Sequence, residues 1–166
     1  QTLVDSCDGD HAVKQVCNAG ISNCRNLVDT TKNKKVISSD GPLSLFEQSD
    51  MGKYLTDRIA CNDNECCFQN EESSIESWLA IDLEGHFEIN AVRLSIGDNL
   101  GSFEIRVGDF PGQGELCFSE QNVQNVFDGP ETLLCSTPIQ GQYLTVKKLG
   151  FERMNICEIE AWGKEI

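Results

Sequence analysis

The stretch WLAIDLEGHFEINAVRLSIGDNLGSFEIRVG, residues 78–108, decides the fold of this chain of 166 residues. Its apolar residues recur at every second position in three short runs, at 79–83, 89–96 and 103–107. A period of two over runs this short is typical of half-buried antiparallel strands. Turn residues separate the runs, first at Glu84-Gly85 and then from Gly97 to Gly101. The stretch therefore predicts three strands joined by short turns.

Composition and charge narrow the classes of protein to which the chain can belong. The length suits one domain that buries about 70% of its unfolded surface. The net charge is −14, and residues 59–92 contain eight acidic residues but no Lys or Arg. Such a surface repels phosphate backbones and anionic lipid, which disfavours nucleic acid as a partner. No apolar run approaches the roughly 20 residues that cross a bilayer, so membrane insertion is not expected.

Nine cysteines point to an oxidising compartment. Their spacing lacks the paired ligands of a zinc site, so we expect disulfides and a secreted, extracellular protein, with Gln1 as a mature N-terminus after processing. The odd count leaves one thiol that stays free or bonds to another chain. The two histidines, His11 and His86, stand in no catalytic motif. No nucleophile–base pair is evident, so the chain is not expected to be an enzyme.

The polar turn cluster Ser38–Pro42 marks the predicted domain boundary. Residues 1–42 form a cysteine-containing N-terminal extension with Cys7, Cys17 and Cys24, predicted to be mostly loop. A segment this small has too little core to fold alone, so we expect disulfides to attach it to the domain at 43–166.

Three motifs resemble the discoidin (coagulation factor V/VIII C-type) domains, and most closely their fucolectin (F-type lectin) branch. They are ESWLAIDLEGHFEINAVRLSIG with the following FEIRVG, then QGQYLTVKKLG, and finally NICEIEAWG, which begin at residues 76, 103, 140 and 155. The motifs keep the family's order, and the resemblance covers residues 43–163. It implies an all-β fold, an antiparallel jelly-roll β-sandwich of the galactose-binding-domain type.

The resemblance also implies disulfide pairs. Fucolectins bond a cysteine before the tryptophan strand to the cysteine that opens the last strand, and Cys61 and Cys157 match these positions. A second family bridge is matched by Cys117 and Cys135. Two alternatives remain for Cys66 and Cys67: a bond between these neighbours, or, as we favour, separate bonds to two of the three cysteines of the extension.

The family's sugar site is only partly represented. Its histidine is replaced by Asp63, and its arginine motif falls near Gly97, where SIGDNLGS contains no Arg and no cysteine pair. The family mechanism for fucose is therefore not expected. A different polar ligand could bind the same loop end through Asp63, Asp98 and Asn99, because rigid sandwiches carry binding residues on their loops.

The family's structural calcium ion takes an Asp from an "AxDG" segment and the Glu after the last-strand cysteine. Asp57 and Glu158 match these ligands, which implies calcium as a cofactor, since calcium binds carboxylate and carbonyl oxygens. The Gly of the segment is replaced by Arg58, so the alternative is that Arg58 pairs with one of the two acids.

These observations lead to two functional hypotheses. The first is a secreted, non-catalytic recognition or adhesion module whose partner is a glycan or glycoprotein. The second is a structural subunit of an extracellular assembly, such as a coat, matrix or filament, whose partners are other copies of itself or related subunits. An intermolecular disulfide would suit the second hypothesis.

Overall fold

The structure is a computed structural model that describes residues 27–39, 54–58, 67–69, 76–97, 101–121, 131–150 and 152–166. Within these ranges the chain forms β1 (Val28–Asp29), β2 (Lys35–Ser38), β3 (Phe68–Gln69), β4 (Trp78–Ile96), β5 (Phe103–Gly108), β6 (Glu115–Glu120), β7 (Glu131–Lys148) and β8 (Asn155–Glu165). The seven strand pairings among the described residues are all antiparallel. The described ranges also include one helical turn, at 54–56. The predicted all-β antiparallel fold is confirmed.

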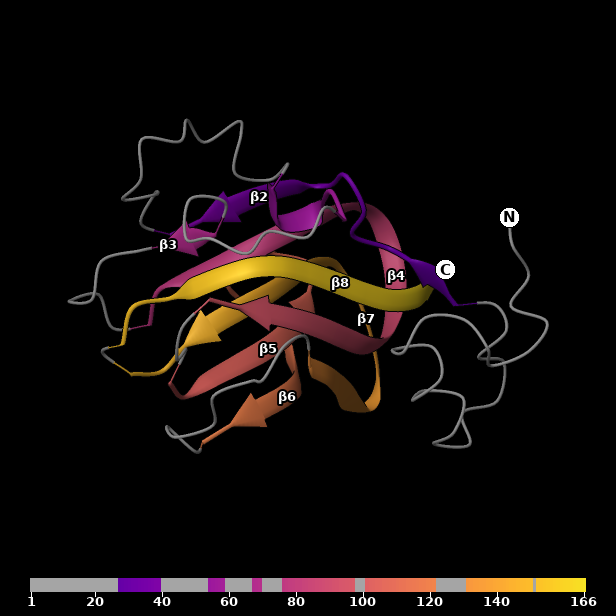
Figure 1. Ribbon diagram of the computed structural model, residues 1–166. Coiled ribbons are helices and arrows are strands. Elements are labelled where there is room, and N and C mark those ends of the chain that lie inside the picture. Colours follow the sequence, from indigo (N-terminus) through magenta and orange to yellow (C-terminus); the bar gives the residue numbers. More distant parts are fainter. Residues whose placement is uncertain are drawn as a thin grey trace.

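The two longest strands, β4 and β7, build both layers of the sandwich. The first part of β4 pairs with β2 and with the second part of β7, and its later part pairs with β8 and the first part of β7. The register of β4 shifts between Asp82 and Phe87. Figure 1 shows β4 and β7 curling back at the side of the molecule where β8 ends. Each strand therefore passes from one layer to the other.

The predicted turn at Glu84-Gly85 coincides with this bend and does not end the strand. Glu84 has a left-handed backbone, with φ of 60°. Hydrogen-bonded pairing resumes on both flanks of the bend, so the first two predicted strands form one continuous element. The third predicted strand is β5. It is separate from β4, as expected.

The core lies between the two layers and follows the predicted alternation. Leu79 and Ile81 from the first part of β4 and Val92 and Leu94 from its second part are all fully buried. They belong to one hydrophobic cluster, so the two parts of β4 face each other across the core. Burial of such side chains contributes about 1.5–3 kcal/mol each.

Part of the predicted N-terminal extension belongs to the sandwich. β1 pairs with β8 at Val28↔Gly163, and β2 pairs with β4 at Val36↔Ile81. The expectation of loop is wrong at β1 and β2, because these two short strands pair with β8 and β4. The sheet thus begins before residue 43. The division into an extension and a domain stays a prediction.

The disulfides confirm one predicted pair and correct another. Cys117 bonds to Cys135, as predicted. Cys157 bonds to Cys67 and not to Cys61. The physical reason is the pairing of β3 with β8 at Phe68↔Ile156, which brings the Cα atoms of Cys67 and Cys157 within 4.0 Å. This bond also excludes both expectations for Cys67, a bond to its neighbour or to the extension. The remaining predicted cysteines lie outside the described residues: Cys7, Cys17, Cys24, Cys61 and Cys66.

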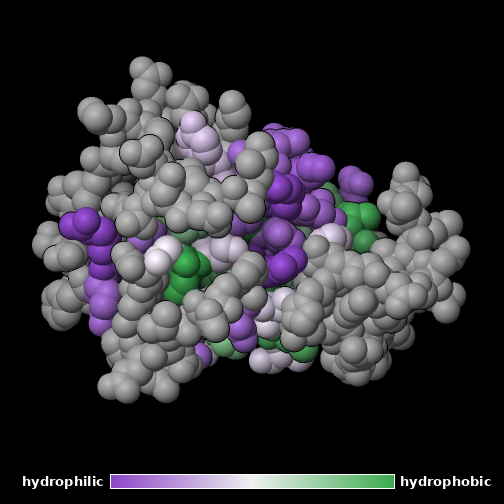
Figure 2. Space-filling model, in the orientation of Figure 1, coloured by the Kyte–Doolittle hydropathy of each residue, from purple (hydrophilic) through white to green (hydrophobic). Residues whose placement is uncertain are grey.

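The strands bring their connections to two opposite ends. β4 and β7 bend at one end, near the end of β8, which we call the turn end (Figure 1). Their first and last residues lie at the opposite end, the loop end, from which the connections at 97–102, 121–130 and 149–154 emerge. On the face drawn in Figure 2, the described surface is mainly hydrophilic, with small, separate hydrophobic patches. No helix in the described ranges has the length and hydropathy of a membrane span.

Candidate functional site

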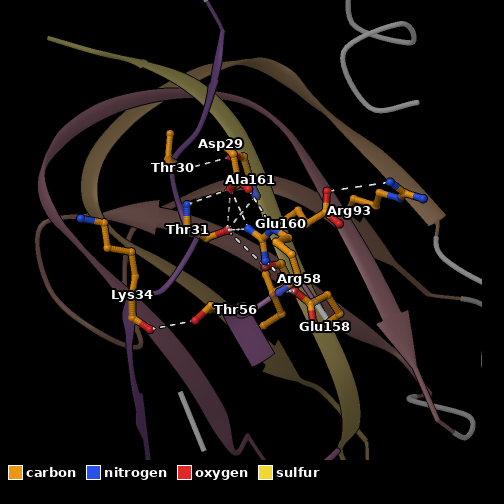
Figure 3. A network of polar contacts seen from close by, with 11 residues as sticks. Asp29, Thr30, Thr31, Lys34, Thr56, Arg58, Arg93, Glu158, Glu160 and Ala161 are labelled. Atoms are coloured by element: carbon orange, nitrogen blue, oxygen red, sulfur yellow. Dashed lines mark hydrogen bonds and ion pairs between the residues drawn. The ribbon is translucent and has the colours of Figure 1, made fainter. Parts of the chain in front are cut away.

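The predicted metal ligand Glu158 lies in a polar network centred on Arg58 (Figure 3). Arg58 follows the helical turn at 54–56 and has a left-handed backbone, with φ of 66°. Glycine adopts this conformation without cost, whereas other residues need compensating contacts. The "AxDG" motif has Gly at this position, so the replacement keeps the backbone of a glycine and adds a long cationic side chain.

The guanidinium group of Arg58 uses all five of its N–H donors. Nε and Nη2 donate to the two carboxylate oxygens of Asp29 at 2.7 and 2.6 Å. Nη1 donates to Oε1 of Glu158 at 2.6 Å and to the carbonyl of Ile159 at 2.9 Å. Nη2 also donates to the hydroxyl of Thr31 at 2.6 Å. The fork-shaped contact with Asp29 is the bidentate geometry for which arginine is best suited.

The backbone around β1 and β8 supports these contacts. The Thr31 hydroxyl accepts a hydrogen bond from the amide of Ala161 at 3.2 Å and donates to the carbonyl of Ile159 at 3.1 Å. The amide of Thr31 donates to Oδ1 of Asp29 at 3.2 Å, and the amide of Thr30 donates to the carbonyl of Ala161 at 2.8 Å. The position of Asp29 is thus supported by contacts that do not involve Arg58.

Glu158 is the second acid of the network, and its two oxygens differ. Oε1 accepts from the backbone amide of Arg58 at 3.1 Å as well as from its guanidinium. Oε2 is buried and has no hydrogen-bond partner within the described ranges. Burial raises the pKa of Glu158 to about 7, the hydrogen bonds and charge of Arg58 oppose this rise, and the charge of Asp57 adds to it. The single positive charge of Arg58 is shared between two carboxylates, those of Asp29 and Glu158, and does not offset the effect of burial on Glu158.

Arg58 itself keeps its charge. Burial disfavours the cation, but the hydrogen bonds and charge of Asp29, together with the hydrogen bond to Glu158, raise the pKa of Arg58 above its ordinary value. The side chains of Arg58, Asp29 and Glu158 are only 16%, 19% and 15% exposed. Screening by water and salt is correspondingly weak at these positions.

The contacts at Glu158 fit the predicted calcium ion poorly. Calcium requires six to eight oxygen ligands, and carboxylates supply most of its counter-charge. Oε1 of Glu158 already accepts two hydrogen bonds from Arg58, and a fixed guanidinium beside it would repel a divalent cation. No group of three potential metal-binding side chains occurs in the part of the chain that the structure describes. The alternative that Arg58 pairs with one of the two acids is confirmed for Glu158.

The residues predicted to bind a ligand lie outside the described residues: Asp63, Asp98 and Asn99. The structure does place the chain on either side of two of them. Gly97 directly follows β4, and Gly101 lies just before β5, so the segment that contains Asp98 and Asn99 connects two strands at the loop end. Arg58 and Cys67 are the nearest described residues to Asp63 along the chain.

A buried lysine lies at the same loop end. Lys148, the last residue of β7, is fully buried, and its Nζ donates to the carbonyl of Glu152 at 3.0 Å. The amide of the next residue, Leu149, donates to the carbonyl of Ser102 at 2.8 Å. These hydrogen bonds join the connection after β7 to the start of β5 and form the base of the loop end.

Sequence reasoning missed two members of the Arg58 network and the burial of Lys148. Asp29 and Thr31 lie in the segment that was expected to be loop. An acid followed two residues later by a threonine is a pattern for a side-chain-to-backbone turn, and it was the only local signal. Lys148 lies two residues after Val146 and four after Leu144 in QGQYLTVKKLG, so it belongs to the same face of the strand, and this spacing was the signal for an inward-facing position.

The architecture is similar to that of several solved carbohydrate-binding proteins. A fucolectin from the serum of the striped bass Morone saxatilis matches with a TM-score of 0.62 and 20% identity, over 80% of this chain and 46% of that one. A fucose-binding module of Streptococcus pneumoniae gives 0.61 and 15%, covering 81% and 96%. Chitosan-binding module 1 from a chitosanase/glucanase of Paenibacillus sp. IK-5 gives 0.63 and 15%, covering 82% and 99%.

These similarities establish the fold as that of fucolectins and discoidin-like galactose-binding modules, as the three sequence motifs predicted. The chain spans about half the length of the striped bass fucolectin and nearly the whole of the two bacterial modules. A comparison with protein-family models finds no match, and neither does a comparison with curated sequences.

Proposed function

We propose that the chain is a secreted, non-catalytic recognition module that binds a glycan or glycoprotein through its loop end. The single observation that carries the proposal is the sandwich itself, which is shared with modules described as fucose-binding and chitosan-binding. In this chain the described strand ends that flank the connections at 97–102, 121–130 and 149–154 lie at one end of the sandwich, where Lys148 is buried. The disulfides at Cys67 and Cys117 support an extracellular location.

The chemistry of the loop end favours a neutral or cationic glycan. The family's histidine and arginines donate hydrogen bonds to sugar oxygens, whereas Asp63, Asp98 and Asn99 offer mainly acceptor oxygens. Acceptors suit the hydroxyl protons of a neutral sugar or the ammonium group of an amino sugar. The net charge of −14 would repel sulfated or sialylated chains. We therefore expect recognition that differs from that of the fucose-binding relatives.

A glycan array, followed by calorimetric titration of the best hit, tests the proposal. Asp98→Ala and Asn99→Ala are expected to weaken binding at least tenfold, which corresponds to about 1.4 kcal/mol. Asp109→Ala is the matched control, because Asp109 is 63% exposed and pairs with His86 at the turn end. Equal losses in the control and in the loop variants would argue against the loop end. A chain that binds no glycan at all would contradict the proposal.

The alternative proposal is a structural subunit of an extracellular assembly. It is favoured by the odd number of cysteines and by hydrophobic side chains at the turn end, where Phe110 is 66% and Ile166 is 63% exposed. Both lie near His86, which accepts a hydrogen bond from the amide of Ile166 and faces Asp109. Sedimentation under reducing and non-reducing conditions would detect assembly. Concentration-dependent assembly without glycan binding would favour this alternative.

A further inference from the structure

We propose that Arg58 is the resident cation of the corner between β1 and β8, where it takes the place of the calcium ion implied by the sequence resemblance. The folded domain then needs no metal ion at this position. Arg58 holds this corner of the sandwich together whether or not the loop end binds a glycan.

The saturation of the guanidinium is the first argument. All five donors end on oxygen atoms, namely both oxygens of Asp29, Oε1 of Glu158, the carbonyl of Ile159 and the hydroxyl of Thr31. Two carboxylates, a carbonyl and a hydroxyl are the kinds of ligand that calcium also takes. A planar fork with five directed donors reaches every group of this set without a metal, and of its oxygen atoms only Oε2 of Glu158 is left without a hydrogen bond in the described residues.

The positions of these oxygens along the chain are the second argument. Asp29 belongs to β1, Glu158 and Ile159 belong to β8, and Arg58 follows the helical turn at 54–56. Arg58 is 29 residues from Asp29 and 100 residues from Glu158 along the chain. A single side chain therefore ties three remote segments, which is the structural role that a bound ion would have. Figure 3 shows Arg58 between the segment of Asp29 and that of Glu158.

The backbone of Arg58 is the third argument. The left-handed conformation costs a residue other than glycine of order 1 kcal/mol, and it is kept where contacts with the surrounding structure stabilise it. Here the amide of Arg58 donates to Oε1 of Glu158, the same oxygen that its guanidinium contacts. The left-handed conformation lets backbone and side chain reach one carboxylate together. The backbone conformation of Arg58 and the contacts of its side chain therefore act together on Glu158.

Thermal unfolding of the full chain at pH 8 tests the proposal, with millimolar calcium chloride in one arm and millimolar EGTA in the other. The wild type is expected to have the same Tm in both arms. Arg58→Met should lower the Tm by about 6–15 °C in both, because it leaves two buried acids without a cation. Arg106→Met is the control, since Arg106 is more exposed and pairs with Glu104 two residues away; it should change the Tm by about 2 °C or less.

A triple variant separates loss of the cation from simple loss of packing. Arg58→Met combined with Asp29→Asn and Glu158→Gln removes the unpaired charges and should regain at least half of the lost Tm. If Arg58→Met does not accumulate as folded protein, the triple variant still carries the test, since it is expected to fold. A wild-type Tm that rises in calcium would overturn the proposal. So would an Arg58→Met variant as stable as the control, or a triple variant no more stable than Arg58→Met.

Discussion

Removing the two described disulfides separately should destabilise the domain by unequal amounts. Cys67 and Cys157 are 90 residues apart, whereas Cys117 and Cys135 are 18 apart. The chain-entropy model gives about 4.6 kcal/mol for the long loop and about 3.2 kcal/mol for the short one. All four cysteines are buried, so the loss of packing on replacement by alanine is similar for the two bridges. The difference of about 1.4 kcal/mol therefore comes from loop closure.

The measurement is urea unfolding of two double variants, Cys67→Ala/Cys157→Ala and Cys117→Ala/Cys135→Ala, beside the wild type under non-reducing conditions. Stability follows from the midpoint and the slope, and equal slopes would show that both variants unfold to comparable states. The variant without the long bridge should have the lower midpoint. The slopes of the two variants will be equal if both expose a similar surface area on unfolding.

Two results would refute this reasoning. If the two variants lose the same stability, or the short bridge costs more, loop closure does not set the contribution of each bridge. If peptide mapping of the wild type finds Cys157 bonded to Cys61, the pairing described for β3 and β8 is wrong at this point. A free thiol at Cys67 in the native protein would have the same meaning.

Three further predictions concern packing, pH and the Arg58 network. Gly141→Ala should lower the free energy of unfolding by about 1–3 kcal/mol, because the added Cβ would lie 2.6 Å from backbone atoms of Gly108. Gly85→Ala is the control: its Cβ would meet only a ring atom of Phe87 at 3.5 Å, so the loss in the same urea assay should be much smaller. The raised pKa of Glu158 means that the folded state binds its proton more tightly than the unfolded chain. The stability that Glu158 contributes should therefore be fully present below about pH 4.5 and be lost, by up to about 3 kcal/mol, as the pH rises through 7. Glu158→Gln should remove this part of the pH dependence, and an unchanged pH dependence would contradict the cause given. Thr31→Val should lower the free energy of unfolding by about 1–3 kcal/mol, since it removes a hydroxyl that is hydrogen-bonded to β8 and to Arg58. An unchanged Tm in thermal unfolding would show that these hydrogen bonds contribute little.

The strands and the shorter disulfide could be predicted because their signals are local. Alternation at 79–83 and 103–107 reports which face of each strand is buried, and that property depends only on neighbouring residues. Both runs bury the predicted side chains. The pair Cys117–Cys135 followed from a resemblance that places one cysteine on each of two strands near each other in the chain. The motifs at 76–97 and 155–163 likewise predicted the fold, because they contain the alternation of buried and exposed residues that forms its core.

Only the tertiary structure decided which remote segments meet. Cys61 and Cys67 are both consistent with the sequence as partners of Cys157, and the pairing of β3 with β8 selects Cys67. In the same way, no local pattern connects Asp29 with Arg58 and Glu158. These residues are remote along the chain, and the packing of their segments brings them together. By itself the sequence determined the periodicity, the buried faces and the acidic, cysteine-rich character of the chain. The partner of each charge and of each distant cysteine depended on the packing of β1, β3 and β8, since long-range contacts follow from the whole sandwich and not from any one segment.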